Sequence, residues 1–204
     1  MDEQINQVSR AHQETVKDWE YAEIGRLLYR FYDRINVRFF ESKVPTPVLS
    51  FRHGRHCLGS YRNGRNESGV QENISISVRH LADSLADVIQ TLAHEMVHSH
   101  QRNFGKPGRG NYHNRACRRR MDEIGIPCDK GGTSLGMRDP FVSFLREHGV
   151  EADARLTLSV AAPRAARSGT RLKRWFCRED CTTIWAIRDV AAHCTKCGCA
   201  FVRA

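Results

Sequence analysis

Residues 91–100 read TLAHEMVHSH and place three histidines and one glutamate in a segment that otherwise has the pattern of a buried helix. Burial of titratable groups is costly unless they find partners. The surrounding apolar residues recur at helical spacing over residues 81–100, which predicts a helix with one inward-facing side. The histidines and the glutamate are therefore candidates for a functional site on that helix.

The spacing within this stretch separates the four polar residues. Each residue of a helix turns the chain by about 100°, so His98 lies about 40° from His94 and one turn further on. Both imidazoles can reach one ion, and Glu95 sits at their shoulder, where it can contact a metal-bound water. His100 lies about 200° from His98 and points away. This H-E-x-x-H pattern favours a zinc peptidase over a pair of surface histidines.

A catalytic zinc ion normally has three protein ligands and an open position for water. Candidates for the third ligand are His113, His80 and the acids near Asp122. We favour His113 because it opens a helix predicted over residues 112–124. The apolar positions of that helix should turn inward and bring His113 toward the H-E-x-x-H helix; they are Cys117, Met121 and Ile124.

Further helices and short strands are expected around this segment. The helices should span residues 18–40 and 140–148, and the strands residues 48–51 and 57–61. Residues 72–78, ENISISV, alternate apolar and polar side chains, which predicts a half-buried strand. We expect this strand to run along the cleft and to bind substrate backbone by strand addition.

The cysteines are concentrated near the C-terminal end. Five of the eight fall between Cys177 and Cys199. Cys177-x3-Cys181 and Cys194-x2-Cys197 have the pair spacing of a four-thiolate zinc site, usually a ribbon of short strands. A module of about thirty residues cannot be stable through burial alone and needs the ion. Cys199 is left over from this set.

The net charge of +9 is unevenly spread. Residues 101–120 contain seven Lys or Arg and no acid, and residues 161–204 contain nine against three acids. Basic surfaces of this kind favour polyanions, most often nucleic acid, although a solvated surface is the alternative. We expect Trp185 in the core. The candidate nucleic-acid contacts are Arg118, Arg119, Arg171, Lys173, Arg174 and Trp175.

Together, residues 24–40, the GSY and ENISISV segments, HEMVHSH and His113 resemble the SprT-like metalloproteases, a group that includes the Spartan DNA–protein crosslink proteases and bacterial SprT proteins. The resemblance covers about residues 21–125, and the zinc-ribbon tail extends it. It implies that His94, His98 and His113 bind zinc and that Glu95 is the catalytic residue. It also suggests that the ribbon binds DNA.

The predicted fold is α+β. A zincin-like metalloprotease domain with a small antiparallel sheet packed on helices should occupy residues 1–150, followed by a flexible basic linker over 151–170 and a zinc ribbon over 171–204. The expected function is that of a zinc-dependent endopeptidase, with one catalytic and one structural zinc ion. Its expected partners are DNA, with single-stranded DNA as one candidate, and proteins bound or crosslinked to DNA.

The alternative function is a nucleic-acid-binding or transcription-associated zinc protein whose H-E-x-x-H site is structural or weakly active. Glu95 favours the enzyme, because a purely structural zinc site does not need a carboxylate there. No apolar run approaches the roughly 20 residues of a membrane span, and the N-terminal residues lack the pattern of a secretory signal. We expect an intracellular monomer without membrane association, cytoplasmic or nucleoid-associated, and nuclear in a eukaryote.

Overall fold

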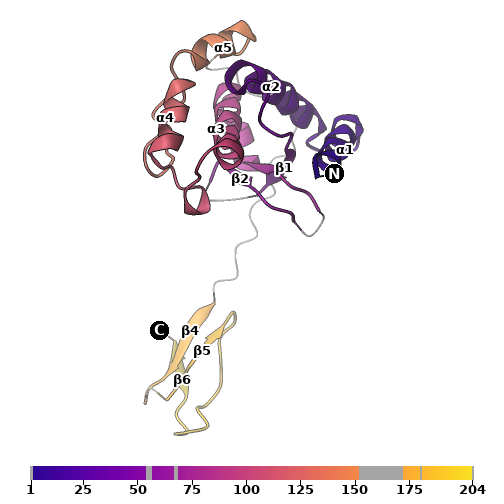
Figure 1. Ribbon diagram of the computed structural model, residues 1–204. Helices are drawn as coiled ribbons and strands as arrows, with labels where there is room; N and C mark the ends of the chain where they lie inside the picture. Colours follow the sequence, from indigo (N-terminus) through magenta and orange to yellow (C-terminus); the bar gives the residue numbers. More distant parts are fainter. Residues whose placement is uncertain (1, 54–56, 67–68, 152–171, 180, 204) are drawn as a thin grey trace. The chain divides into compact units, whose positions relative to one another are not determined.

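The computed structural model of the protein describes residues 2–53, 57–66, 69–151, 172–179 and 181–203 (Figure 1). The chain divides into two compact units, Met1–Ala161 and Ala162–Ala204. Apart from its first residue, the predicted linker lies outside the described residues, so the predicted domain boundaries stay a prediction. Among the described helices, none is long and apolar enough to cross a membrane.

The first unit combines helices with a small sheet, which confirms the α+β class. Helix α3 carries the H-E-x-x-H motif and packs against α2, α4 and strands β2 and β3 (Figure 1). In chain order, the described elements are α1 (Asp2–Thr15), α2 (Ala22–Phe40), β1 (Val48–Arg52), β2 (Gly59–Arg62), β3 (Asn73–Ser77), the 3-10 helix η1 (Val78–Ala82), α3 (Leu85–Phe104), the 3-10 helix η2 (Arg109–Asn111), α4 (Arg115–Glu123) and α5 (Phe141–Glu147).

Helix α3 begins at Leu85 rather than at Leu81. Ser84 accounts for the difference, because its side chain caps the helix by accepting a 3.1 Å hydrogen bond from the Asp87 amide. Leu81 belongs to η1 but is still buried. The inward side of α3 is buried as its periodicity predicts; its apolar members are Val88, Ile89, Leu92, Ala93, Met96 and Val97.

The sequence does not predict helix α1. Helix α2 begins at Ala22 rather than at residue 18. Polar tertiary contacts hold α1 in place. The Gln13 side-chain amide donates to the Leu49 carbonyl at 2.7 Å, and Arg10 pairs with Asp33 of α2 at 2.6 Å. Such contacts leave no apolar stripe in the sequence, so periodicity alone does not reveal this helix.

The sheet of the first unit has the strand order β1-β3-β2. Strand β3 pairs in parallel with β1 and antiparallel with β2, so the predicted antiparallel sheet is in fact mixed. The prediction of a half-buried strand is also wrong, because Ser75 and Ser77 are buried along with Ile74 and Ile76. The hydroxyl groups of Ser75 and Ser50 lie 2.7 Å apart, which satisfies these polar groups inside the protein.

The central place of β3 overturns the predicted mode of substrate binding. A strand can accept an added peptide only along an edge whose backbone groups are unpaired. Both edges of β3 are paired, and the free edges of this sheet belong to β1 and β2. Strand addition at β3 is therefore excluded.

The second unit contains an antiparallel sheet of β4 (Lys173–Cys177), β5 (Thr183–Ala186) and β6 (Phe201–Arg203) in the order β5-β4-β6. Alternation along β4 places Trp175 on the same face as the buried Cys177, and Trp175 is only 8% exposed. Trp185 stands opposite Arg174 on the other face and is 61% exposed. The expectation of a core Trp185 and an accessible Trp175 is thus wrong for both residues.

Candidate metal centres

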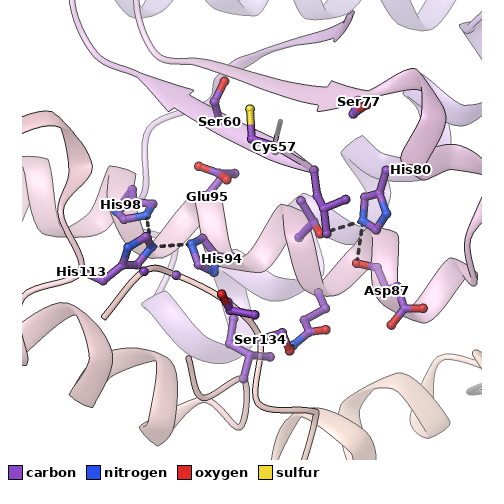
Figure 2. Close-up of a pocket in the computed structure, with 18 of the residues that line it drawn as sticks. Cys57, Ser60, Ser77, His80, Asp87, His94, Glu95, His98, His113 and Ser134 are labelled. Atoms are coloured by element: carbon purple, nitrogen blue, oxygen red, sulfur yellow. Dashed lines mark hydrogen bonds between the residues drawn. The ribbon is translucent and has the colours of Figure 1, made fainter. Parts of the chain in front are cut away.

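Three histidine nitrogens converge in the first unit. The Nε2 atom of His113 lies 2.8 Å from that of His94 and 3.1 Å from that of His98 (Figure 2). Zinc–nitrogen bonds of about 2.0–2.1 Å in a tetrahedral site place ligand nitrogens roughly 3.3 Å apart. Small ring rotations would therefore admit an ion, and three ligands leave the open position of a catalytic site.

His113 reaches the other two histidines from a loop, not from a helix. Helix α4 begins at Arg115, and Asn114 caps it by accepting a 2.9 Å hydrogen bond from the Cys117 amide. The same Asn114 oxygen accepts a second 2.9 Å bond from the Gln101 side chain of α3. The predicted helical position of His113 is wrong, but Asn114 ties its loop directly to the helix that carries the other histidines.

Burial keeps the histidines ready to bind metal. It is the main reason that the pKa of His94 falls to about 4 and that of His98 to about 3, and neighbouring imidazoles add to both shifts. The pKa of His113 is lowered as well, again chiefly by burial. All three imidazoles are consequently neutral at physiological pH, as a metal ligand must be.

Glu95 is 6% exposed, and its carboxylate points toward β2, near Ser60 (Figure 2). Gly59 permits this approach, because a Cβ atom there would lie 2.8 Å from the Glu95 Oε1 atom. Burial raises the pKa of Glu95 to about 8, while the backbone of Tyr61 and the charge of Arg52 oppose the shift. A cation held by the histidines would lower this pKa and favour the ionised carboxylate.

All four residues line one cavity of about 1070 Å³. Strand β2 forms one wall, and residues 131–137 form another. The second wall lies directly against a histidine, because a Cβ atom at Gly132 would be 2.3 Å from Cε1 of His113. Ser134 holds this wall to α3 by accepting a 2.6 Å hydrogen bond from Gln90. Sequence reasoning missed this wall, although the Gly131-Gly132 pair is a signal of close backbone approach.

The other candidates for the third ligand have different partners. His80 lines the same cavity, but its ring nitrogens lie 2.6 Å from the Asp83 carboxylate and 2.8 Å from the Thr91 hydroxyl. These contacts tie η1 to α3. Asp122 pairs with Arg138 on the surface. Neither residue joins the three converging histidines.

His100 faces away from the cavity, as the helical geometry predicts. Its ring packs against Phe40 and Phe104, with a centroid separation of 5.3 Å in each case. It is therefore part of the packing between α3 and α2.

The second metal centre lies in the second unit. The sulfur atoms of Cys177, Cys181, Cys194 and Cys197 lie within 4.8 Å of one another, with Cys177 and Cys197 3.2 Å apart. Gly198, at φ +76°, makes the turn after the second pair. The backbone amide of Lys196 lowers the pKa of Cys194, which favours the thiolate form that binds metal. This set of cysteines fits an ion bound by four thiolates, and Cys199 is not part of the set.

The candidate nucleic-acid contacts are in several environments. Arg118 donates to the His113 carbonyl at 3.1 Å, so it supports the ligand loop. Arg119 is exposed, with Glu123 at 3.4 Å. Arg171 lies outside the described residues.

In the ribbon, Lys173 pairs with Asp189 at 2.7 Å, whereas Arg174 is exposed beside Trp185. Trp175 is buried among the ribbon strands, so its ring is not available to stack on a base. Trp185 offers the accessible ring of this sheet instead.

A comparison with protein-family models matches residues 28–133, just over half of the chain, to the SprT-like family. The matched range includes β2, β3, α3, the three histidines and Gly132. A search of curated proteins finds no match for the chain.

The contact between Gly132 and His113 leads to a prediction about metal affinity. Gly132→Ala should weaken binding at the histidine site by roughly tenfold to a hundredfold, the range typical when a partner of a ligand is altered. Gly136→Ala is the matched control, because φ is positive at both glycines but nothing lies within 4 Å of Gly136. Cobalt(II) titration can follow this site separately from the thiolate site. Equal affinities in the two variants would contradict the prediction.

The cysteine cluster leads to a second prediction. Cys194→Ser should reduce bound zinc from two ions per chain to one, measured by elemental analysis, and should unfold the ribbon, measured by the fluorescence of Trp175. Cys199→Ser should retain both ions, because Cys199 lies outside the four-sulfur set. Loss of one ion in the Cys199 variant would instead place this residue among the ligands.

Proposed function

The chain belongs to the SprT-like family, and from this membership we propose that it is a zinc-dependent endopeptidase with a zincin-like catalytic domain, acting on proteins bound or crosslinked to DNA. The family suggests a metalloprotease-type domain. The observation that carries the proposal is the convergence of His94, His98 and His113 in an open cavity that also holds Glu95. A structural zinc site would have a fourth protein ligand in place of the open position.

The proposed chemistry assigns a separate task to each residue. His94, His98 and His113 would hold the zinc ion, which would supply Lewis-acid activation of water and of the scissile carbonyl. Glu95 takes a proton from the attacking water and passes it to the leaving amine. Its burial supports this role, because burial raises the proton affinity of the carboxyl group while a bound cation would keep it ionised and able to accept a proton.

The outer edge of β2 at Gly59 is the proposed binding surface for the substrate backbone, whereas at Tyr61 this edge is occupied by the side chain of Asn111. The Leu58 carbonyl accepts a 2.7 Å hydrogen bond from the Ser77 amide, so it faces β3. Alternation then turns the backbone groups of Gly59 toward the free edge, next to Glu95. A peptide that pairs with this edge would pass directly over the catalytic residue, and this proposal replaces strand addition at β3.

DNA association is proposed from the charge beside this cavity. The segment that joins α3 to His113 carries exposed basic side chains, and Gly110 and Asn111 of the same segment line the cavity. Phosphate binding here would hold DNA-bound proteins close to the catalytic residues. The basic side chains are Lys106 and Arg109 within the segment, with Arg102 in the last turn of α3 and Arg115 at the start of α4.

In the ribbon, the exposed pair Arg174 and Trp185 is the proposed contact with unpaired bases. An aromatic ring can stack on any base, while the adjacent guanidinium can bind a phosphate. This assignment replaces Trp175, whose ring is buried.

The protease proposal is tested with Glu95→Gln, a DNA-binding protein as substrate, and single-stranded DNA present or absent. The variant should retain zinc but cleave about 10²–10⁴-fold more slowly, since it lacks the general base. Glu123→Gln, which alters a surface carboxylate of α4, should cleave like the wild type. If Glu95→Gln and the wild type behave identically under every condition, the nucleic-acid-binding alternative replaces the protease.

The proposed role of Trp185 is tested by the affinity for single-stranded DNA, measured by fluorescence anisotropy at one fixed salt concentration. Trp185→Ala should weaken binding by about 1–3 kcal/mol, the usual contribution of one stacked base. Trp185→Phe should retain most of the affinity because it keeps an aromatic face. Equal weakening by both substitutions would contradict stacking.

A further inference from the structure

Glu72 is a buried carboxylate next to the catalytic helix. It is 5% exposed and precedes β3. Its Oε2 atom accepts hydrogen bonds from the Tyr61 hydroxyl at 2.6 Å and from the Ser99 hydroxyl at 2.9 Å. Tyr61 belongs to β2, and Ser99 directly follows His98 on α3. Glu72 therefore links the cavity wall to the helix at the position next to a metal ligand.

Tyr61 and its strand reach two further parts of the site. Its strand, β2, approaches Glu95 so closely that a Cβ atom at Gly59 would lie 2.8 Å from the Glu95 Oε1 atom. The Tyr61 carbonyl accepts a 2.8 Å hydrogen bond from the Asn111 side chain. Asn111 lies two residues before His113 and adopts a positive φ of 60°. Tyr61 thus contacts the loop of the third histidine directly, and its strand lies against Glu95.

From these contacts we infer that Tyr61 and Glu72 are positioning residues, which fix Glu95 and the His113 loop relative to α3. The inference rests on the proposed role of Glu95. A hydrogen bond to a carboxylate is shorter and stronger than one between neutral groups, so Glu72 restrains the Tyr61 ring more firmly than a neutral acceptor would. A shift of Tyr61 would also change the position of Gly59 on the same strand, and Gly59 is where β2 approaches Glu95 most closely.

A purely structural tyrosine would behave differently, and the chain offers a matched control. Tyr32 is also buried, and its hydroxyl donates to the backbone carbonyls of Val44 at 2.9 Å and Pro45 at 2.6 Å. These partners lie outside the residues that line the cavity. Tyr32→Phe therefore removes a comparable buried hydrogen bond and leaves the hydrogen bonds of Tyr61 with Glu72 and Asn111 in place.

The first experiment needs no enzymatic activity. Hydrogen–deuterium exchange is measured by mass spectrometry on the zinc-loaded full chain. Tyr61→Phe should speed exchange in residues 59–62 and 109–114, because the restraint on both segments is lost. Tyr32→Phe should leave these segments unchanged. Ser99→Ala is a milder second variant, which should speed exchange in residues 59–62 by weakening the position of Glu72.

The second experiment compares steady-state kinetics. Tyr61→Phe should lower kcat by roughly tenfold to a hundredfold with KM unchanged, because misplacing a catalytic group impairs the chemical step. The Tyr61→Phe, Glu95→Gln double variant should lose less activity than the product of the two single effects, since part of the effect of Tyr61 acts through Glu95. Glu72→Gln, which keeps an acceptor oxygen, should retain more activity than Glu72→Ala.

The outcomes separate this inference from the proposed function. The inference is wrong if Tyr61→Phe matches Tyr32→Phe in exchange, or if its effect on kcat adds fully to that of Glu95→Gln. If the wild type cleaves no substrate but the exchange contrast is present, the protease proposal fails while the positioning role stands.

Discussion

The architecture of the first unit depends on the return of the chain to α3 at His113, which lies beyond the end of that helix. Two histidines one turn apart on α3 provide only half of a metal site, and the third must come from a loop. The side chain of Asn114 holds this loop in place, because it caps α4 and also accepts a hydrogen bond from Gln101 of α3. Helix start, loop position and ligand geometry are therefore set by the same residue.

The two cavity walls also lie directly against the candidate site residues. Gly59 lets β2 approach Glu95, and Gly132 lets the opposite wall contact His113. At either position a Cβ atom would clash with the neighbouring side chain, so these close approaches require glycine. The two glycines thus let both walls approach the site, and α3 lines the cavity between them with Thr91, His94 and His98 among its side chains.

The features predictable from sequence were those with a fixed local geometry. The 3.6-residue repeat located the inward side of α3, the pairing of His94 with His98 and the outward direction of His100. Cysteine spacing predicted which four sulfur atoms lie close together in the second unit. Each of these depends on residues that are near neighbours in the chain.

Features set by distant partners were not predictable in this way. The central position of β3 depends on pairing with β1, and helix α1 depends on contacts of Gln13 and Arg10 with segments far along the chain. Trp185 has the more apolar sequence neighbours, yet the pairing of β4 with β5 leaves its ring exposed and buries that of Trp175. The network of Tyr61 and Glu72 is likewise invisible until the strands are placed.

The loop between the metal ligands has a thermodynamic consequence. After His98 the chain completes α3 at Phe104, passes through the exposed basic segment and returns at His113, so an ion bound by both histidines would close residues 98–113 into a ring. Closing a loop reduces its conformational entropy. A polyanion that prefers the closed conformation must then tighten metal binding by the same factor by which the metal tightens polyanion binding. Metal binding at the three histidines and polyanion binding at the basic segment would therefore be coupled, because both would involve the same segment of backbone.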